Sequence, residues 1–152
     1  MSGHPLAAVI CAEARTWLGT PYHDQACTKG IGVDCAGLIL GVAQAVGLTD
    51  PTWRPPPYHP AWHVFDPGEL LWQTMEALGV TPLAPGRVCP GDLLLFRWRD
   101  HPSHGHGAVV LEGGRLIHAL SRTGVIVQRF TPAWQHYATR AGRYPEALWR
   151  PC

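Results

Sequence analysis

The hydrophobic pattern of this chain changes its period near residue 91. Before that point, residues 5–18 and 35–46 are apolar at helical spacing or nearly all round, and a glycine follows each run. After it come short β-branched or leucine-rich runs separated by glycines, at 92–98, 106–111, 115–120 and 125–130. A short helix is expected over 132–139. Helices followed by strands predict an α+β fold, with N-terminal helices packed on a C-terminal antiparallel sheet.

Composition limits the class of protein. The 152 residues fit a single domain, 1–152, with a core of its own. Twelve basic and eleven acidic residues leave a net charge of +1, which predicts no nucleic-acid partner and no anionic membrane surface. No apolar run approaches the roughly 20 residues that span a bilayer. The N-terminus lacks the basic and apolar regions of a secretory signal, so we expect cytoplasmic synthesis without a signal peptide.

Two segments between the helical and strand regions have distinctive local signals. Residues 50–67 contain six prolines, which exclude a regular element. The insert at about 50–66 also carries four aromatic residues, so it is either a rigid loop pinned by those rings or a substrate lid or docking surface. Asp66 then predicts an N-cap and Glu69 the glutamate of a capping box, for a helix that runs to about Leu78.

One cysteine stands at a helix start. The five cysteines are odd in number, widely spaced and free of any C-x-x-C pair, which argues against a disulfide framework or a four-cysteine zinc site. Cys35 follows a glycine-containing loop and opens the apolar run 35–46. The positive end of a helix dipole favours thiolate over thiol, and the thiolate is the nucleophile. Cys35 is therefore the candidate nucleophile.

Two histidines in the strand region are the candidate base and its orienting partner. His106 begins one strand and His118 lies inside the next. A two-residue turn at Gly113 and Gly114 would place the imidazoles on opposite faces of the sheet. A three-residue loop over 112–114 pairs Ala108 with His118 and places both imidazoles on one face, about 7–8 Å apart at Cα. We therefore predict a loop of odd length or a bulge.

The order of the motifs adds a family resemblance. They are W-L-G-T-P-Y at 17–22, D-C-A-G at 34–37, P-G-D-L-L-L-F at 90–96, H-G-A-V at 106–109 and I-H-A at 117–119. In this order and spacing the chain resembles the NlpC superfamily of papain-like cysteine peptidases, over roughly residues 8–130.

The resemblance implies a papain-like fold and a cysteine endopeptidase that cleaves peptidoglycan stem peptides, commonly at the D-glutamyl–diamino-acid bond, with no metal and no cofactor. Cys35 would be the nucleophile, His106 the general base and acid, and His118 the orienting third group. Tyr22 would help the oxyanion site, and Asp34 would help hold the stem peptide.

Two departures from the family pattern stand beside the match. Ala36 occupies a position where serine is usual, which implies one substrate hydrogen bond fewer. Gly107 and Ala108 follow His106 in place of a β-branched residue and glycine, which predicts a looser start to that strand.

Relatives without a signal peptide also resemble the cell-wall peptidases of phage tails and gene-transfer particles. That likeness implies tail or baseplate partners, delivery to the wall in a particle, and a docking role for the insert.

Other functions remain open at this level. Two groups of closely spaced histidines suggest a zinc hydrolase: the pair His59 and His63, and the run His101, His104 and His106. No H-E-x-x-H pattern accompanies them. His104 is also a rival for the base, since it shares strand parity with His106. A catalytically silent structural or wall-binding tail component of the same fold is the alternative of a different class. An acyltransferase or amidase on this fold is a further one.

Overall fold

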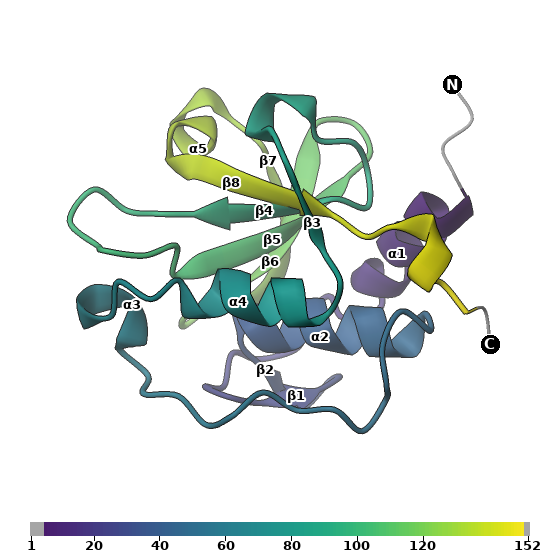
Figure 1. The fold of residues 1–152 in the computed structure, drawn as a ribbon, viewed down its shortest axis with the longest axis horizontal. Helices are drawn as coiled ribbons and strands as arrows, with labels where there is room; N and C mark the ends of the chain where they lie inside the picture. The colour runs from purple at the N-terminus through teal and green to yellow at the C-terminus, as the bar shows by residue number, and fades with distance from the viewer. Residues whose placement is uncertain (1–4, 151–152) are drawn as a thin grey trace.

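A six-stranded antiparallel sheet is the centre of the structure, which is a computed structural model describing residues 5–150 apart from the side chain of His63. Its strand order is β3-β8-β4-β5-β6-β7 (Figure 1). The strands of this sheet are β3 (Thr81–Leu83), β4 (Leu93–Phe96), β5 (His106–Leu111), β6 (Arg115–Leu120), β7 (Gly124–Arg129) and β8 (Ala138–Arg143). A small hairpin pairs β1 (Cys27–Thr28) with β2 (Gly32–Val33). The helices are α1 (Pro5–Arg15), α2 (Cys35–Ala45), α3 (Trp62–Phe65), α4 (Leu70–Ala77) and α5 (Pro132–Tyr137), with 3-10 turns at Pro85–Arg87 and Glu146–Leu148.

The sheet has a buried cluster on each face because alternate side chains point to opposite sides. On one face, Leu93, Val109 and Ile117 belong to the main core with residues of α1, α2 and α4, and α2 lies directly under the sheet in Figure 1. On the other face, Phe96 and Leu116 form a second cluster under α5 and its aromatic residues. The predicted α+β architecture, helices first and antiparallel sheet second, is confirmed.

The β5–β6 connection confirms the predicted odd-length loop. Leu111 pairs with Arg115 and Val109 pairs with Ile117, so residues 112–114 form a three-residue loop. In this register His106 and His118 lie on the same face of the sheet, which is the face covered by α5.

The predicted capping box is wrong. Helix α4 begins at Leu70, and Glu69 is its N-cap residue in the left-handed region at φ 55°. Asp66 instead accepts a hydrogen bond from the Gly68 amide at 2.8 Å, in a turn before the helix. The Glu69 carboxylate is engaged by His104, so it does not reach back to cap its own helix.

Strand β8 was not expected from the sequence, which predicted helix up to residue 139. The segment Ala138–Arg143 has no alternation of apolar residues, yet it lies between β3 and β4. Pairing with strands on both sides supplies its backbone hydrogen bonds. At Gly142 a Cβ would collide with the Val80 side chain, so the missing side chain allows the close packing of this strand.

Residues 50–66, hereafter the proline strap, have no regular structure before the single turn of α3. The chain of the strap runs beneath α2 and the β1–β2 hairpin in Figure 1. Trp53 and Tyr58 are partly buried against the main core and Trp62 belongs to it, so aromatic rings pin the strap to the body of the protein.

The carboxylate of Asp92 ties β4 to β8 and offers a test of the sheet's stability. Buried Asp92 accepts hydrogen bonds from Arg143 at 2.9 and 2.7 Å and from the Cys89 amide at 2.7 Å. We expect Asp92→Ala to lower the free energy of unfolding by about 2 kcal/mol, since charge-assisted bonds are lost and an amide loses its acceptor. Chemical denaturation measures this change. The exposed Asp100 is the control, and equal effects of Asp92→Ala and Asp100→Ala would contradict the assignment.

Candidate active site

Cys35 is the first residue of α2, and a side-chain cap fixes this helix start. Asp34 Oδ1 accepts a hydrogen bond from the Gly37 amide at 2.7 Å, which is the usual satisfaction of an orphan donor at a helix N-terminus. The thiol Sγ lies 3.9 Å from the Gly105 carbonyl oxygen, and the Gly107 amide also donates toward it. The thiol therefore contacts the backbone on both sides of His106, at the start of β5.

Gly107 explains how α2 comes so close to β5. A Cβ on Gly107 would lie only 2.8 Å from Ile39 Cδ1, so a larger residue would push the end of the Ile39 side chain aside, and glycine lets α2 pack closely without that shift. The expectation that Gly107 and Ala108 loosen the start of the strand is not met, because β5 begins at His106 and His106–Leu111 are all buried. The departure from the family pattern fits tight packing of the helix that carries Cys35.

The protonation state of Cys35 differs from the expected one. Burial, and then the negative charge of Asp34, raise the pKa of the Cys35 thiol to about 12, whereas the helix N-terminus alone favours a lower pKa. The physical reason is desolvation: a side chain withdrawn from water loses more by being charged than the helix dipole returns. In the resting chain Cys35 is a neutral thiol, so it would need a base to act as a nucleophile.

The two predicted histidines meet on the sheet face opposite α2. His106 Nε2 lies 2.8 Å from His118 Nδ1, and the ring centroids are 4.9 Å apart. His118 Nε2 lies 2.9 Å from Gln128 Oε1 on β7. Three side chains from three adjacent strands thus form one continuous chain of hydrogen bonds.

Two tryptophans cover this histidine pair. The Trp134 ring lies 5.0 Å from the His118 ring, centroid to centroid, in an edge-on contact, and Trp98 stacks over His106 at 6.3 Å. His118 is fully buried. Burial lowers the pKa of His118 to about 4, so this imidazole is neutral at pH 7.

The lowered pKa of His118 predicts how stability changes with pH. Between pH 6.5 and 4 the unfolded chain binds a proton on this imidazole that the folded chain excludes, so stability is lost as the pH falls through that window. The contribution at pH 7 is about 3 kcal/mol relative to pH 4. We expect denaturant unfolding at pH 7 and pH 4.5 to show a smaller loss for His118→Asn than for the wild type. Equal losses would contradict a neutral buried His118.

Tyr22 and Asp34, the predicted oxyanion and substrate residues, lie beside Cys35, the candidate nucleophile. Tyr22 bridges Val33 next to the helix start, and burial raises the pKa of its hydroxyl, so that hydroxyl stays protonated. Asp34 Oδ2 accepts hydrogen bonds from the Gln25 amide at 2.8 Å and from the Tyr58 hydroxyl. Asp34 is therefore fully engaged by the protein's own donors.

Tyr58 is a site residue that the sequence analysis did not single out. Besides its hydroxyl contact with Asp34, its amide and carbonyl bond the Gln25 side chain at 3.1 and 2.6 Å. It joins the proline strap to the loop before α2. A cavity of about 240 Å³ lies under this contact, and its lining includes Asp34, Ala36, Arg54 and Tyr58. The aromatic content of the strap was the only signal in the sequence.

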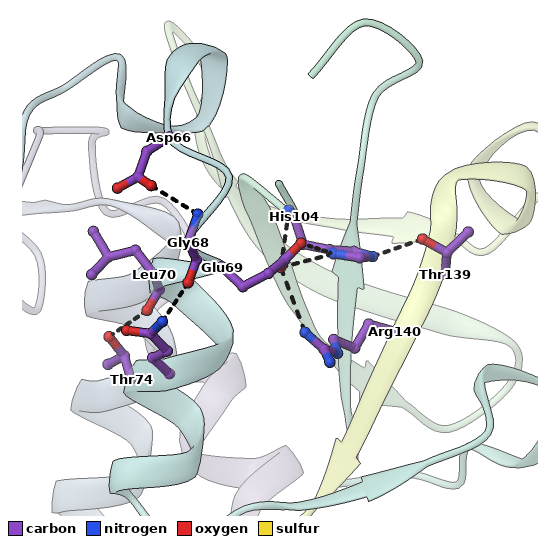
Figure 2. A network of polar contacts seen from close by, with 9 residues as sticks. Asp66, Gly68, Glu69, Leu70, Thr74, His104, Thr139 and Arg140 are labelled. Carbon is purple, nitrogen blue, oxygen red and sulfur yellow. Dashed lines mark hydrogen bonds and ion pairs between the residues drawn. The ribbon is translucent and has the colours of Figure 1, made fainter. Parts of the chain in front are cut away.

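His104, the rival base, belongs to a separate network (Figure 2). Its Nδ1 lies 3.1 and 3.0 Å from the two Glu69 carboxylate oxygens, and its Nε2 lies 2.7 Å from Thr139 Oγ1. Arg140 approaches the same carboxylate at 3.6 Å. Both ring nitrogens are thus committed to joining the start of α4 to β8, which disfavours His104 as the base.

Among residues 5–150, leaving aside the side chain of His63, no three histidine, cysteine, aspartate or glutamate residues gather where they would hold a metal ion. The zinc alternative partly rests on His63, whose side chain lies outside the described structure. No helix within the same residues is long and apolar enough to cross a membrane.

Comparison with known proteins identifies the family of this chain. The sequence model of the NlpC/P60 family matches residues 19–143. A comparison with curated proteins found no significant match. Among solved structures, the NlpC/p60 domain of the peptidoglycan hydrolase SagA is 27% identical, with a TM-score of 0.60 over 91% of this chain and 98% of that one.

Two more distant structures share the fold. An NLP/P60 family protein from Staphylococcus aureus, described as similar to lipoprotein, is 22% identical with a TM-score of 0.60, covering 93% of this chain and 42% of that one. RipD from Mycobacterium tuberculosis, described as a non-catalytic NlpC/p60 domain protein adapted to peptidoglycan binding, is 14% identical with a TM-score of 0.57, covering 93% and 98%. The family match over most of the length, on this fold, means that the chain belongs to the NlpC/P60 family, whose members are generally cysteine peptidases of the cell wall and include non-catalytic proteins.

Proposed function

We propose that this protein is a peptidoglycan endopeptidase that cleaves stem peptides, in one 1–152 domain, through Cys35, His106 and His118. Two contacts support the proposal, one made by the residue just before His106 and one by His106 itself. The Cys35 thiol lies against the Gly105 carbonyl, and His106 bonds His118 at 2.8 Å. A nucleophile, a base and a group that orients the base are the parts a cysteine hydrolase needs.

The mechanism follows from the neutral thiol. Cys35 Sγ attacks the carbonyl carbon of a peptide bond while its proton passes to His106. The Cys35 backbone N–H, unpaired within the helix because it belongs to the first turn, and the protonated Tyr22 hydroxyl hold the oxyanion. His106 then gives its proton to the leaving amine, which leaves a thioester. A water molecule, losing its proton to His106, hydrolyses the thioester to a carboxylic acid and regenerates the thiol.

The bond we propose is the D-glutamyl–diamino-acid bond of the stem peptide, as the family resemblance implies, with no metal or cofactor. The cavity beneath the strap supports a peptide substrate, because it opens beside the helix start and offers the Arg54 cation and the Asp34 carboxylate. A peptide end that binds there must share Asp34 with Tyr58 or displace it.

A catalytically silent, wall-binding protein is the second candidate. Two observations favour it: RipD has this fold and is described as non-catalytic, and the Cys35 thiol is buried with a raised pKa. Delivery in a phage-like tail or gene-transfer particle, with tail or baseplate partners, remains a prediction from the resemblance, because none of the three structures named above is described as a tail protein.

A panel of purified muropeptides of differing chemotype tests the proposal. With reductant present, the wild-type protein is expected to release fragments whose masses correspond to cleavage after D-glutamate in at least one chemotype. Fragments from cleavage at another amide would support peptidase activity and show that the scissile bond is not the one proposed. Co-sedimentation with isolated cell walls in the absence of any fragment would support the wall-binding candidate.

A further inference from the structure

We infer that Gln128 is a positioning residue that fixes the tautomers of both histidines, and through them makes His106 Nδ1 the proton acceptor. The inference rests on the proposed function for its catalytic meaning. It begins from a contact that the motifs did not include: Gln128, on β7, places its amide oxygen 2.9 Å from His118 Nε2.

The first step is the proton count on His118. Burial lowers the pKa of this imidazole to about 4, so at pH 7 the ring carries one N–H. In the orientation that the structure gives the Gln128 amide, its oxygen faces His118 Nε2 and can only accept, so the N–H of this ring is on Nε2. His118 Nδ1 is left with a lone pair. A glutamine held with its oxygen toward Nε2 thus takes the accepting place that a carboxylate takes in other triads, whereas a flipped amide would donate to Nε2 and reverse the tautomer.

The second step is that the tautomer of His118 determines the tautomer of His106. Its Nε2 lies 2.8 Å from His118 Nδ1, and a lone pair at Nδ1 of His118 requires His106 to donate from Nε2. In a neutral His106 the remaining lone pair is then on Nδ1. When His106 takes the thiol proton, the cation that forms still donates to His118 from Nε2, so no hydrogen bond has to be remade during the reaction.

The surroundings of His106 and His118 leave few other hydrogen-bond partners for the two imidazoles. His118 is fully buried, and the Trp134 ring covers it at 5.0 Å, so water does not compete at the junction of the two imidazoles. Gln128 itself is only partly buried. Water is therefore available to replace the amide if the side chain is removed, which limits the expected effect.

The experiment combines NMR with kinetics on the full chain. Long-range ¹⁵N–¹H spectra of the histidine rings, without substrate, are expected to show both His106 and His118 protonated on Nε2 in the wild type and in Gln128→Glu. In Gln128→Met, which has similar size and no strong acceptor, His118 should show a mixture of tautomers. Gln135→Met is the matched control, because the Gln135 side-chain amide donates to the Phe130 carbonyl at 2.9 Å and not to a histidine, so this change should leave the histidine signals unchanged.

The kinetics then separate positioning from structure. We expect Gln128→Met to lower kcat roughly 10- to 100-fold at unchanged KM, less than the roughly 10⁴-fold loss that a wrong tautomer causes in a serine-protease triad, since water can replace the amide. Gln128→Glu should retain most of the rate. His118 protonated on Nδ1 in the wild type, or an unchanged tautomer and rate in Gln128→Met, would overturn the inference. Absence of wild-type turnover would count against the proposed function alone, because the ring spectra need no activity.

Discussion

Cys35→Ala is expected to abolish cleavage of stem peptides, lowering kcat by about 10⁴-fold or more, because no other group at the helix start can form the acyl intermediate. The fold should survive, since the substitution removes one sulfur atom at a site where α2 is already capped by Asp34. Binding to cell walls should also persist. Steady-state kinetics, thermal unfolding and co-sedimentation measure these three properties on the same preparations.

Other cysteines provide the control for this substitution. Cys89 is exposed, and its contact at 3.9 Å is with the Arg87 carbonyl, so Cys89→Ala should retain the full rate. Cys27 is partly buried, 3.2 Å from the Gly37 carbonyl, and Cys27→Ala should cost little in rate. A rate in Cys35→Ala equal to that of Cys89→Ala would show that Cys35 is not the nucleophile.

His106→Ala is expected to lower kcat by about 10²–10⁴-fold, because it removes the group that accepts and returns the proton. His118→Ala should cost less, since orientation contributes less than proton transfer. The raised pKa of Cys35 sharpens this expectation, because a neutral thiol depends on its base. Kinetics of both variants over pH 5–9 measure the difference.

Raised pH distinguishes a missing base from a damaged fold. In His106→Ala, part of the lost rate should return toward high pH as hydroxide ionises the thiol, whereas a misfolded variant would not recover. His104→Ala is the control, because His104 bonds Glu69 and Thr139 and lies outside the triad. A larger loss in His104→Ala than in His106→Ala would reassign the base.

Much of this site followed from sequence because local rules determine it. The requirement that His106 and His118 share one face of the sheet predicted a loop of odd length by strand alternation, and the register of β5 and β6 confirms it. The helix start at Cys35 followed from the loop and apolar run around it. Propensity and alternation are properties of neighbouring residues, so they are readable without a structure.

The remainder depends on contacts between distant segments. Strand β8 has no apolar alternation and exists because β3 and β4 pair with it. Glu69 is drawn from its expected capping role by His104, 35 residues away. The contact of Tyr58 with Asp34 and the burial that raises the pKa of Cys35 also join distant segments, whereas Gln128 lies only 10 residues from His118, across the β6–β7 hairpin. Neither burial nor partner choice is encoded in a local pattern.

The most direct test of the central claim is a paired digestion of stem-peptide muropeptides by the wild type and by Cys35→Ala, followed by mass spectrometry. The account predicts fragments from the wild type only, with a new amine and a new carboxylate at the D-glutamyl–diamino-acid bond. Fragments from both proteins, or from neither across several chemotypes with reductant present, would contradict a Cys35 peptidase.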